Sequence, residues 1–179
     1  MKNKEKFIMY IWICSLVTII VIGTILCLRR PSGEIVQANK EILSTADKIR
    51  SYYRNRPDYW GLDTQAVIKD ELYIGKIEND KIINNLGEEV VIGSDIDGTT
   101  IMPGQRIFSI SYLQVMQKQC IELASFRWQE EGKLGLISFK IQNDSGDYEF
   151  SWGNKGLPLS RNYAKQYCKE KNNLSWTFE

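Results

Sequence analysis

The chain opens with a long apolar stretch. Residues 7–28 read FIMYIWICSLVTIIVIGTILCL, which is 22 residues without a charged side chain. At a helical rise of about 1.5 Å per residue, this segment spans roughly 33 Å and can cross the hydrocarbon core of a bilayer. Tyr10 and Trp12 lie near one end, as in an interfacial aromatic belt. The pattern predicts a transmembrane helix.

A cleaved secretory signal is the alternative for the same residues. Such a signal has an apolar region of about 7–15 residues, followed directly by small residues at the cleavage site. Here Arg29 and Arg30 follow instead, and the nearest small-residue site, 36–38, lies well beyond the apolar end. We therefore expect an uncut membrane anchor over residues 1–30 and a folded domain over residues 31–179.

The charges on either side of the apolar stretch favour one orientation only slightly. Lys2, Lys4 and Lys6 precede the stretch, and Arg29 and Arg30 follow it. The positive-inside rule leans toward a cytoplasmic N-terminus, and a long C-terminal domain translocates largely regardless of so small a bias. We therefore expect the domain to lie outside the cytoplasm.

A second helix is predicted after the break at 31–33. Between Ile35 and Tyr53 the apolar residues recur at steps of three or four, while most charged residues occupy the rest of the helix surface. The apolar positions are Ile35, Ala38, Ile42, Ala46, Ile49 and Tyr53. A helix with one apolar stripe needs another layer, such as a sheet, to cover that stripe.

The C-terminal half alternates apolar and polar residues, as strands do. Strands are expected at 108–112, 134–141, 148–152 and 174–178, with a helix at 115–127; the weaker patterns at 62–72 and 88–92 predict a short helix and a short strand. The strand 134–141 is mostly apolar, which favours a central position. The sum is an α+β fold, in which the amphipathic helix packs on a mainly antiparallel sheet.

Composition narrows the classes of function. With 23 basic and 22 acidic residues, nothing indicates a nucleic-acid surface. Histidine is absent, which removes the commonest general base and the commonest metal ligand. Cys14 and Cys27 lie in the apolar stretch, whereas Cys120 and Cys168 lie in the polar domain and could pair there in an oxidising compartment. We expect no metal, no cofactor and no nucleic-acid partner.

The strongest argument for an enzyme is the sequence DIDGTT at 95–100, which follows the apolar run 90–92. It is similar to the nucleophile motif of haloacid-dehalogenase-type phosphatases, in which Asp95 would attack phosphorus and Asp97 would act as acid and base. That chemistry also needs Mg²⁺ held by further carboxylates, and only Asp147 remains as a poor later acidic partner. An ordinary Asp-Gly turn is favoured, and a membrane-anchored phosphatase is the alternative function.

Two ligand-binding interpretations are weaker. As a calcium loop, the same segment has Thr100 at the required glycine position and Arg106 at the required glutamate position. The tryptophans could form a carbohydrate platform, although aromatic residues on strands more often belong to a core or an interface. The four tryptophans of the domain, which this interpretation would use, are Trp60, Trp128, Trp152 and Trp176.

In this order the segments resemble a type IVb pilin, the subclass that includes the bundle-forming and toxin-coregulated pilins. Four stretches carry the resemblance: the apolar helix leading into 35–53, the segments 61–63 and 80–87, the strand 108–112 leading to 119–123, and 167–169 near the C-terminus. The resemblance implies a Cys120–Cys168 disulfide that bounds a region shaping subunit contacts. It also implies a fibre polymerised through N-terminal helices, with other pilin subunits and the assembly machinery as partners.

The resemblance further places the anchor in the bacterial inner membrane and the domain in the periplasm, or on an extracellular pilus. One departure concerns processing, because pilins carry a glycine-ended leader before the apolar helix and a glutamate at the fifth mature position. Here no glycine precedes the apolar run, and Glu5 lies among lysines in a polar segment. We therefore expect a pilin-like subunit or a minor or accessory pilin that remains as an uncut anchor. An assembly factor that uses a pilin fold is a further alternative.

Overall fold

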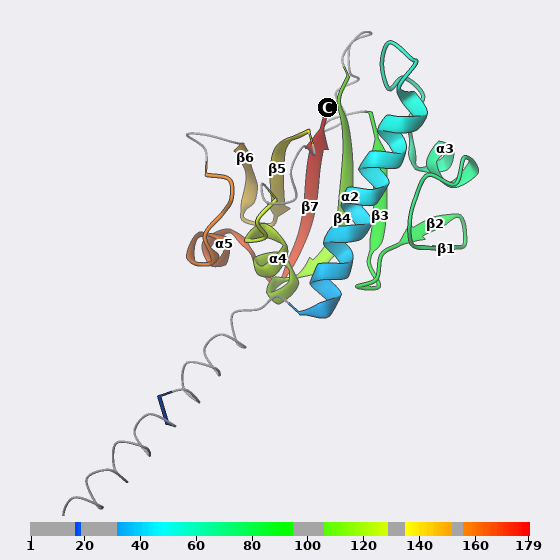
Figure 1. Ribbon diagram of the computed structural model, residues 1–179. Coiled ribbons are helices and arrows are strands. Elements are labelled where there is room, and N and C mark those ends of the chain that lie inside the picture. Colours follow the sequence, from blue (N-terminus) through cyan, green and yellow to red (C-terminus); the bar gives the residue numbers. More distant parts are fainter. Residues whose placement is uncertain (1–16, 19–31, 95–105, 129–134, 152–155) are drawn as a thin grey trace, which may run out of the picture. The chain divides into compact units, whose positions relative to one another are not determined.

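The computed structural model describes residues 17–18, 32–94, 106–128, 135–151 and 156–179 (Figure 1). The chain divides into two compact units, Met1–Ser32 and Gly33–Glu179. In the first unit, Val17 and Thr18 are helical and exposed, and the rest of the predicted span 7–28 lies outside the described residues. Within the described ranges, no helix combines the length and the apolar composition that a bilayer crossing requires.

The described part of the second unit contains four helices and seven strands. Along the chain they are α2 (Gly33–Tyr53), α3 (Thr64–Lys69), β1 (Lys76–Glu78), β2 (Lys81–Ile83), β3 (Glu89–Gly93), β4 (Phe108–Met116), α4 (Gln117–Ala124), β5 (Leu136–Asn143), β6 (Gly146–Ser151), α5 (Arg161–Tyr167) and β7 (Lys171–Phe178). The predicted amphipathic helix and most of the predicted strands are confirmed, with bounds shifted by a few residues.

Helix α2 buries the stripe that the sequence predicts. Its six apolar positions, from Ile35 to Tyr53, are each at most 2% exposed. Burying one large aliphatic side chain contributes about 1.5–3 kcal/mol, so this face determines where the helix packs. Glu34 in the first turn and Arg50 in the last turn also complement the helix dipole.

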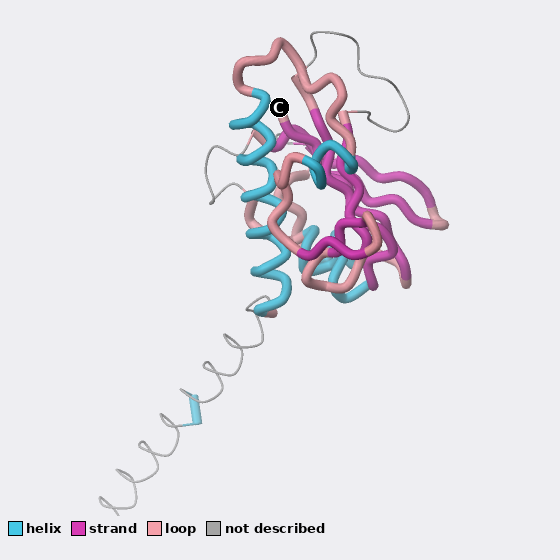
Figure 2. Tube along the Cα trace, turned by 90° about the vertical axis from the view of Figure 1, so that its right-hand side faces the viewer, coloured by secondary structure: helices cyan, strands magenta, loops and turns pink. Residues whose placement is uncertain are grey.

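The strands form one seven-stranded sheet in the order β1-β2-β3-β4-β7-β5-β6, and the pairings between them are antiparallel. Helix α2 runs across one face of this sheet, and Figure 2 shows helix and sheet as separate layers. This confirms the predicted α+β class with an antiparallel sheet.

The core lies between α2 and the sheet face that alternation points toward it. On β4 and β7, Phe108 lies opposite Phe178, and Ile110 lies opposite Trp176. All four side chains are fully buried. Trp128, which follows α4, packs its ring against Trp176 with the centroids 5.6 Å apart.

The helix predicted at 115–127 is shorter than expected, because Val115 and Met116 belong to β4. After a shift in register, they pair with Asn172 and Lys171 on β7. Gln114, immediately before them, has a positive φ of 59°, which accommodates the irregularity. Backbone hydrogen bonding to a strand that is distant in sequence therefore overrides the local helical pattern at these two residues.

The strand predicted at 134–141 is an interior strand, β5, paired with β7 on one side and with β6 on the other, although it is not at the middle of the sheet. Strand β5 is the neighbour of the edge strand β6, because β7 is inserted between β4 and β5. Its apolar residues are buried nonetheless: Phe139 and Ile141 lie opposite Trp176 and Leu174 of β7. The short strands β1 and β2 and helix α5 have no counterpart among the predicted elements.

Candidate functional site

The two domain cysteines form a disulfide bond in the structure. Cys120 lies in α4, and Cys168 is the residue that ends α5. Their Cα atoms are 5.9 Å apart, their separation in sequence is 48 residues, and both side chains are fully buried. The bond therefore closes a loop that contains α4, the β5–β6 hairpin and α5.

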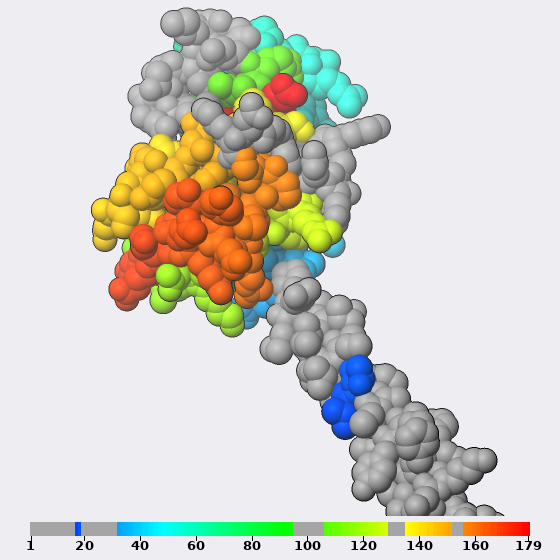
Figure 3. Space-filling model, turned by 90° about the vertical axis from the view of Figure 1, so that its left-hand side faces the viewer, coloured from blue at the N-terminus to red at the C-terminus, as the bar shows by residue number. Residues whose placement is uncertain are grey.

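The described part of the disulfide-bounded region, residues 120–168, brings α5 next to the β5–β6 hairpin. Figure 3 shows α5 and the β5–β6 hairpin side by side on one face of the molecule. Tyr167 of α5 packs against Tyr148 and Phe150 of β6, with ring centroids 4.8 and 5.1 Å away. Ser160 begins α5, because its hydroxyl oxygen accepts a hydrogen bond from the amide of Tyr163.

Asn172 joins the turn after Cys168 to the central sheet. This side chain is 1% exposed, and all of its hydrogen-bonding capacity is used. Its Oδ1 accepts from Lys169 N at 2.8 Å and from Asn143 Nδ2 at 3.0 Å. Its Nδ2 donates to the carbonyl oxygens of Lys169 and Val115, at 2.8 and 3.1 Å. The side-chain amide of Asn172 thus links its own strand, β7, to β4, to β5 and to the turn after Cys168.

A buried polar cluster lies beneath α2. Glu41, which is 5% exposed, accepts hydrogen bonds from Asn85 N at 3.2 Å and from Gln37 Nε2 at 3.4 Å. Burial raises the pKa of the Glu41 carboxyl, and these two hydrogen bonds offset part of that rise. Burial also raises the pKa of Tyr73 and Tyr112 nearby, and the charge on Glu41 raises both further.

We expect Glu41→Gln to flatten the dependence of stability on pH. Because its pKa is raised on folding, Glu41 contributes most to stability below its ordinary pKa of 4.5. That contribution decreases as the pH rises through the folded pKa. Glutamine keeps an oxygen for Asn85 N but cannot ionise. Urea unfolding of the wild type and the variant across a pH series would measure the difference.

The control for this substitution is Glu34→Gln, which changes an exposed glutamate in the first turn of the same helix. It removes a charge that favours the helix dipole, so it should lower stability at neutral pH, the opposite of the change expected for Glu41→Gln. Identical profiles for Glu41→Gln and the wild type would contradict the prediction.

The sheet face opposite α2 is lined by small hydroxyl side chains. Ser109 and Ser111 of β4 lie opposite Thr177 and Ser175 of β7, and the hydroxyl oxygens of Ser111 and Ser175 are 2.8 Å apart. They form part of a groove of about 550 Å³. Among its described lining residues, the ionisable ones are Asp63, Lys140 and Glu149.

Two of these ionisable groups have structural partners. Asp63 caps α3 by accepting from Ala66 N at 2.7 Å, and Lys140 pairs with Asp147 at 3.0 Å. The groove is therefore mainly a surface of neutral hydroxyls. Within the described ranges, no group of three or more acidic or cysteine side chains is placed to hold a metal ion.

The proposed phosphatase aspartates, Asp95 and Asp97, lie outside the described residues. The strands that the structure does describe on either side of them, β3 and β4, pair with each other in an antiparallel hairpin. That hairpin differs from the parallel βαβ unit that the phosphatase interpretation needs, so the fold does not support this alternative.

The tryptophans do not form one platform. Trp176 of β7 and Trp128, which follows α4, belong to the core, at 0% and 1% exposure. Trp60 is 74% exposed at the turn after α2. Trp152 lies outside the described residues.

Solved structures of pilins share this fold. A type IVb pilin from Salmonella typhi matches with a TM-score of 0.52 at 15% sequence identity, covering 78% of this chain and 95% of that one. TcpA, a type IV pilin from the El Tor biotype of Vibrio cholerae, matches with a TM-score of 0.55 at 12% identity, covering 83% of this chain and all of the other. The chain therefore has a type IVb pilin-like fold.

Sequence comparison adds no closer relationship. No protein-family model matches the chain, and no curated protein sequence matches it. The likeness to pilins is consequently one of tertiary structure, at identities that establish the fold alone.

Asn172 and its partners were not predicted from the sequence. Nothing marks Asn172 among its polar neighbours, because its partners come from β4, β5 and the turn after Cys168. A second feature, the density of arginine and aromatic residues over 50–60, is visible in the sequence. The structure shows that Arg106 joins it from the start of β4.

Proposed function

We propose that the chain is a minor or accessory pilin-like protein of a bacterial type IV pilus. Residues 7–28 hold it in the inner membrane, and its folded domain lies in the periplasm. Its role is structural rather than enzymatic, and its partners are other pilin subunits and the pilus assembly machinery.

The observation that carries this proposal is the type IVb pilin-like fold. A 21-residue helix packs on an antiparallel sheet, and a disulfide bounds the region that contains α4, β5, β6 and α5. The apolar segment 7–28 stands shortly before this helix in the sequence, where a membrane anchor or fibre-forming helix would be needed.

The exposed side of α2 is suited to contacts with neighbouring subunits. Its apolar stripe is already used by the sheet, whereas Lys40, Asp47 and Lys48 are exposed on the same helix. A surface with charges of both signs favours specific, reversible binding of a partner over the formation of a permanently buried apolar interface. Such a face suits an accessory role beside other pilins.

The segment before the apolar stretch favours a static anchor over a fibre core. Lys2, Lys4 and Lys6 would accompany the helix into any bundle of packed helices. Burying each ammonium group without an acidic partner would cost several kcal/mol. A helix that stays in the bilayer leaves these lysines in water and avoids the cost.

We expect the cellular protein to keep its full mass in the presence of the prepilin peptidase and to be absent from sheared fibres. Intact-mass measurement in strains with and without the peptidase tests the first point, and immunoblotting of sheared fibres tests the second. The host's major pilin, measured in the same strains, is the control for active cleavage. Recovery of a shortened chain in fibres would contradict the static anchor and show that the protein is a fibre subunit. Full-length protein that associates with no pilin would contradict the pilus role altogether.

A further inference from the structure

One end of the domain carries three arginines that form no ion pair with a described carboxylate. Arg54 and Arg56 follow the last turn of α2, and Arg106 precedes β4. All three are exposed. The ion pairs between described residues involve other side chains, so none of these three guanidinium groups has a described carboxylate within 4.0 Å. Three cations on one surface without such partners attract an anionic ligand.

Aromatic rings hold two of these guanidinium groups in place. The Arg56 group lies over the rings of Tyr53 and Tyr52, at 4.5 and 5.1 Å from their centroids. The Arg106 group lies over the Tyr59 ring at 5.4 Å and donates from Nη1 to the main-chain oxygen of Arg56 at 2.7 Å. A ring face holds the flat guanidinium by cation–π attraction and leaves edge N–H groups free for a ligand.

Two aromatic side chains at this end face solvent. Trp60 is 74% exposed and Tyr52 is 42% exposed. Tyr59, next to Trp60, is buried. The main-chain amide of Trp60 donates a hydrogen bond to Asp58 Oδ1 at 3.1 Å, and this bond orders the turn on which the exposed indole lies. Tryptophan, tyrosine and arginine, the residue types gathered here, are the ones most enriched among residues that dominate binding energy at interfaces.

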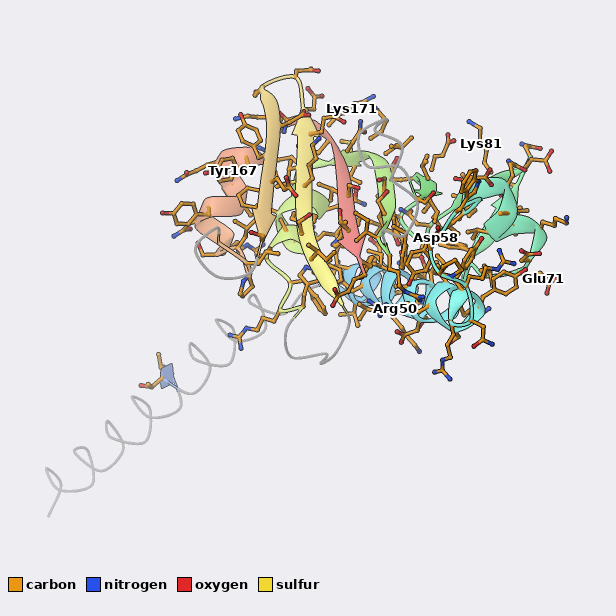
Figure 4. The ribbon with its side chains drawn as sticks, turned by 90° about the horizontal axis from the view of Figure 1, so that it is seen from above. Arg50, Asp58, Glu71, Lys81, Tyr167 and Lys171 are labelled. Atoms are coloured by element: carbon orange, nitrogen blue, oxygen red, sulfur yellow. A yellow bond between two sulfur atoms is a disulfide. The ribbon has the colours of Figure 1, made fainter. Side chains whose placement is uncertain are left out.

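The same end of the domain is hollowed. A depression of about 610 Å³ is lined by Arg50, Arg54 and Arg106 together with Tyr59 and other residues. Of its two acidic residues, Asp47 pairs with Arg50, with Oδ1 3.3 Å from Nη1, and Glu179 contacts Arg50 through its main-chain oxygen, which accepts from Nε at 2.7 Å. The depression therefore has three lining arginines against two acidic residues, and Arg54 and Arg106 have no described carboxylate within 4.0 Å. Figure 4 looks down onto this end, with Arg50 and Asp58 labelled.

We propose that this arginine–aromatic surface, formed by Tyr52, Arg54, Arg56, Trp60 and Arg106, binds an acidic polysaccharide that carries carboxylate groups. A guanidinium group can donate two parallel hydrogen bonds to the two oxygens of one carboxylate. The exposed indole offers a flat apolar face for the C–H side of a sugar ring. A single-stranded nucleic acid would call for a longer basic track along its phosphates than three arginines provide.

The arginine–aromatic surface lies beside the C-terminal end of α2. This helix has 21 residues, so its two ends are about 30 Å apart, and the surface lies at the end far from Gly33. The binding itself does not depend on fibre assembly or on anchoring.

The test measures binding of fluorescently labelled alginate oligosaccharide to the full chain in detergent micelles. We expect saturable binding that weakens as salt is raised, and no binding to labelled dextran of the same size. Trp60→Ala should weaken binding about tenfold, and the double variant R54Q/R106Q should weaken it at least as much. R54K/R106K should recover only part of that loss, because lysine keeps the charge without the fork.

Matched controls come from α5, on another part of the domain. Tyr163→Ala removes an aromatic side chain that is 57% exposed, and Lys165→Gln removes an exposed cation. Both should bind alginate as the wild type does, and unchanged unfolding curves would show that all variants are folded.

Several results would overturn the proposal. One is equal affinity for alginate and dextran, and another is a loss of binding in the α5 variants as large as in Trp60→Ala. Tighter binding of single-stranded DNA or of polyglutamate than of alginate would assign the surface to a nucleic acid or to an acidic protein instead. Because all of these measurements use the purified chain in detergent, they are independent of the fibre and cleavage experiments.

Discussion

Replacing Cys120 and Cys168 together with alanine should lower the free energy of unfolding by about 4 kcal/mol. The disulfide closes a 48-residue separation, and in the chain-entropy model a cross-link over such a loop removes that much unfolded-state entropy. A domain of this size has only about 5–15 kcal/mol of net stability, so the loss is a large fraction of the whole. Urea unfolding of the full chain in a mild detergent, followed by tryptophan fluorescence, would measure it.

The matched control is the double alanine variant of Cys14 and Cys27, the cysteines of the apolar stretch. It should leave unfolding of the domain unchanged. Reductant should reproduce the loss in the wild type and have no effect on the variant that lacks Cys120 and Cys168. Thiol labelling of denatured, unreduced protein should find two reactive cysteines, and four would mean that this disulfide does not form.

Asn172→Asp should cost about 3–5 kcal/mol at neutral pH, as expected for an uncompensated buried charge. Asparagine and aspartate have the same shape, so packing is preserved. The new carboxylate oxygen would replace the Nδ2 donor and face the carbonyl oxygens of Val115 and Lys169. Two hydrogen bonds would become two repulsions inside a site that is 1% exposed.

The pH dependence of this variant provides an internal check. Burial would raise the pKa of the new carboxyl, and its protonated form can again donate a hydrogen bond. The loss of stability should therefore shrink as the pH is lowered below that pKa. Asn173→Asp is the matched control, because Asn173 Oδ1 only accepts a hydrogen bond from Gln114 N. Equal losses in the two variants would contradict the role given to Asn172.

Local pattern was enough to predict the elements that depend on a residue's near neighbours. The apolar steps from Ile35 to Tyr53 specify which side of α2 is buried, because helical periodicity alone places these residues on one face. The alternation at 174–178 similarly separates the buried Trp176 from the hydroxyls of Ser175 and Thr177 on β7. The residues of the β5–β6 hairpin turn at 143–146 likewise favour turns by their own backbone preferences.

Partners far apart in sequence were beyond the reach of such patterns. The sequence by itself determined the buried face of α2, the alternating faces of the main strands and hence the α+β class. Only the tertiary structure decided that β7 lies between β4 and β5, that Asn172 joins three strands to the turn after Cys168, and that Arg106 stands beside the turn after α2. The physical reason is that these features depend on contacts of different range. The periodic burial of side chains is set within a single helix or strand. Strand pairing, the four hydrogen bonds of Asn172 and the stacking of Arg106 form only when the folded chain brings distant segments together.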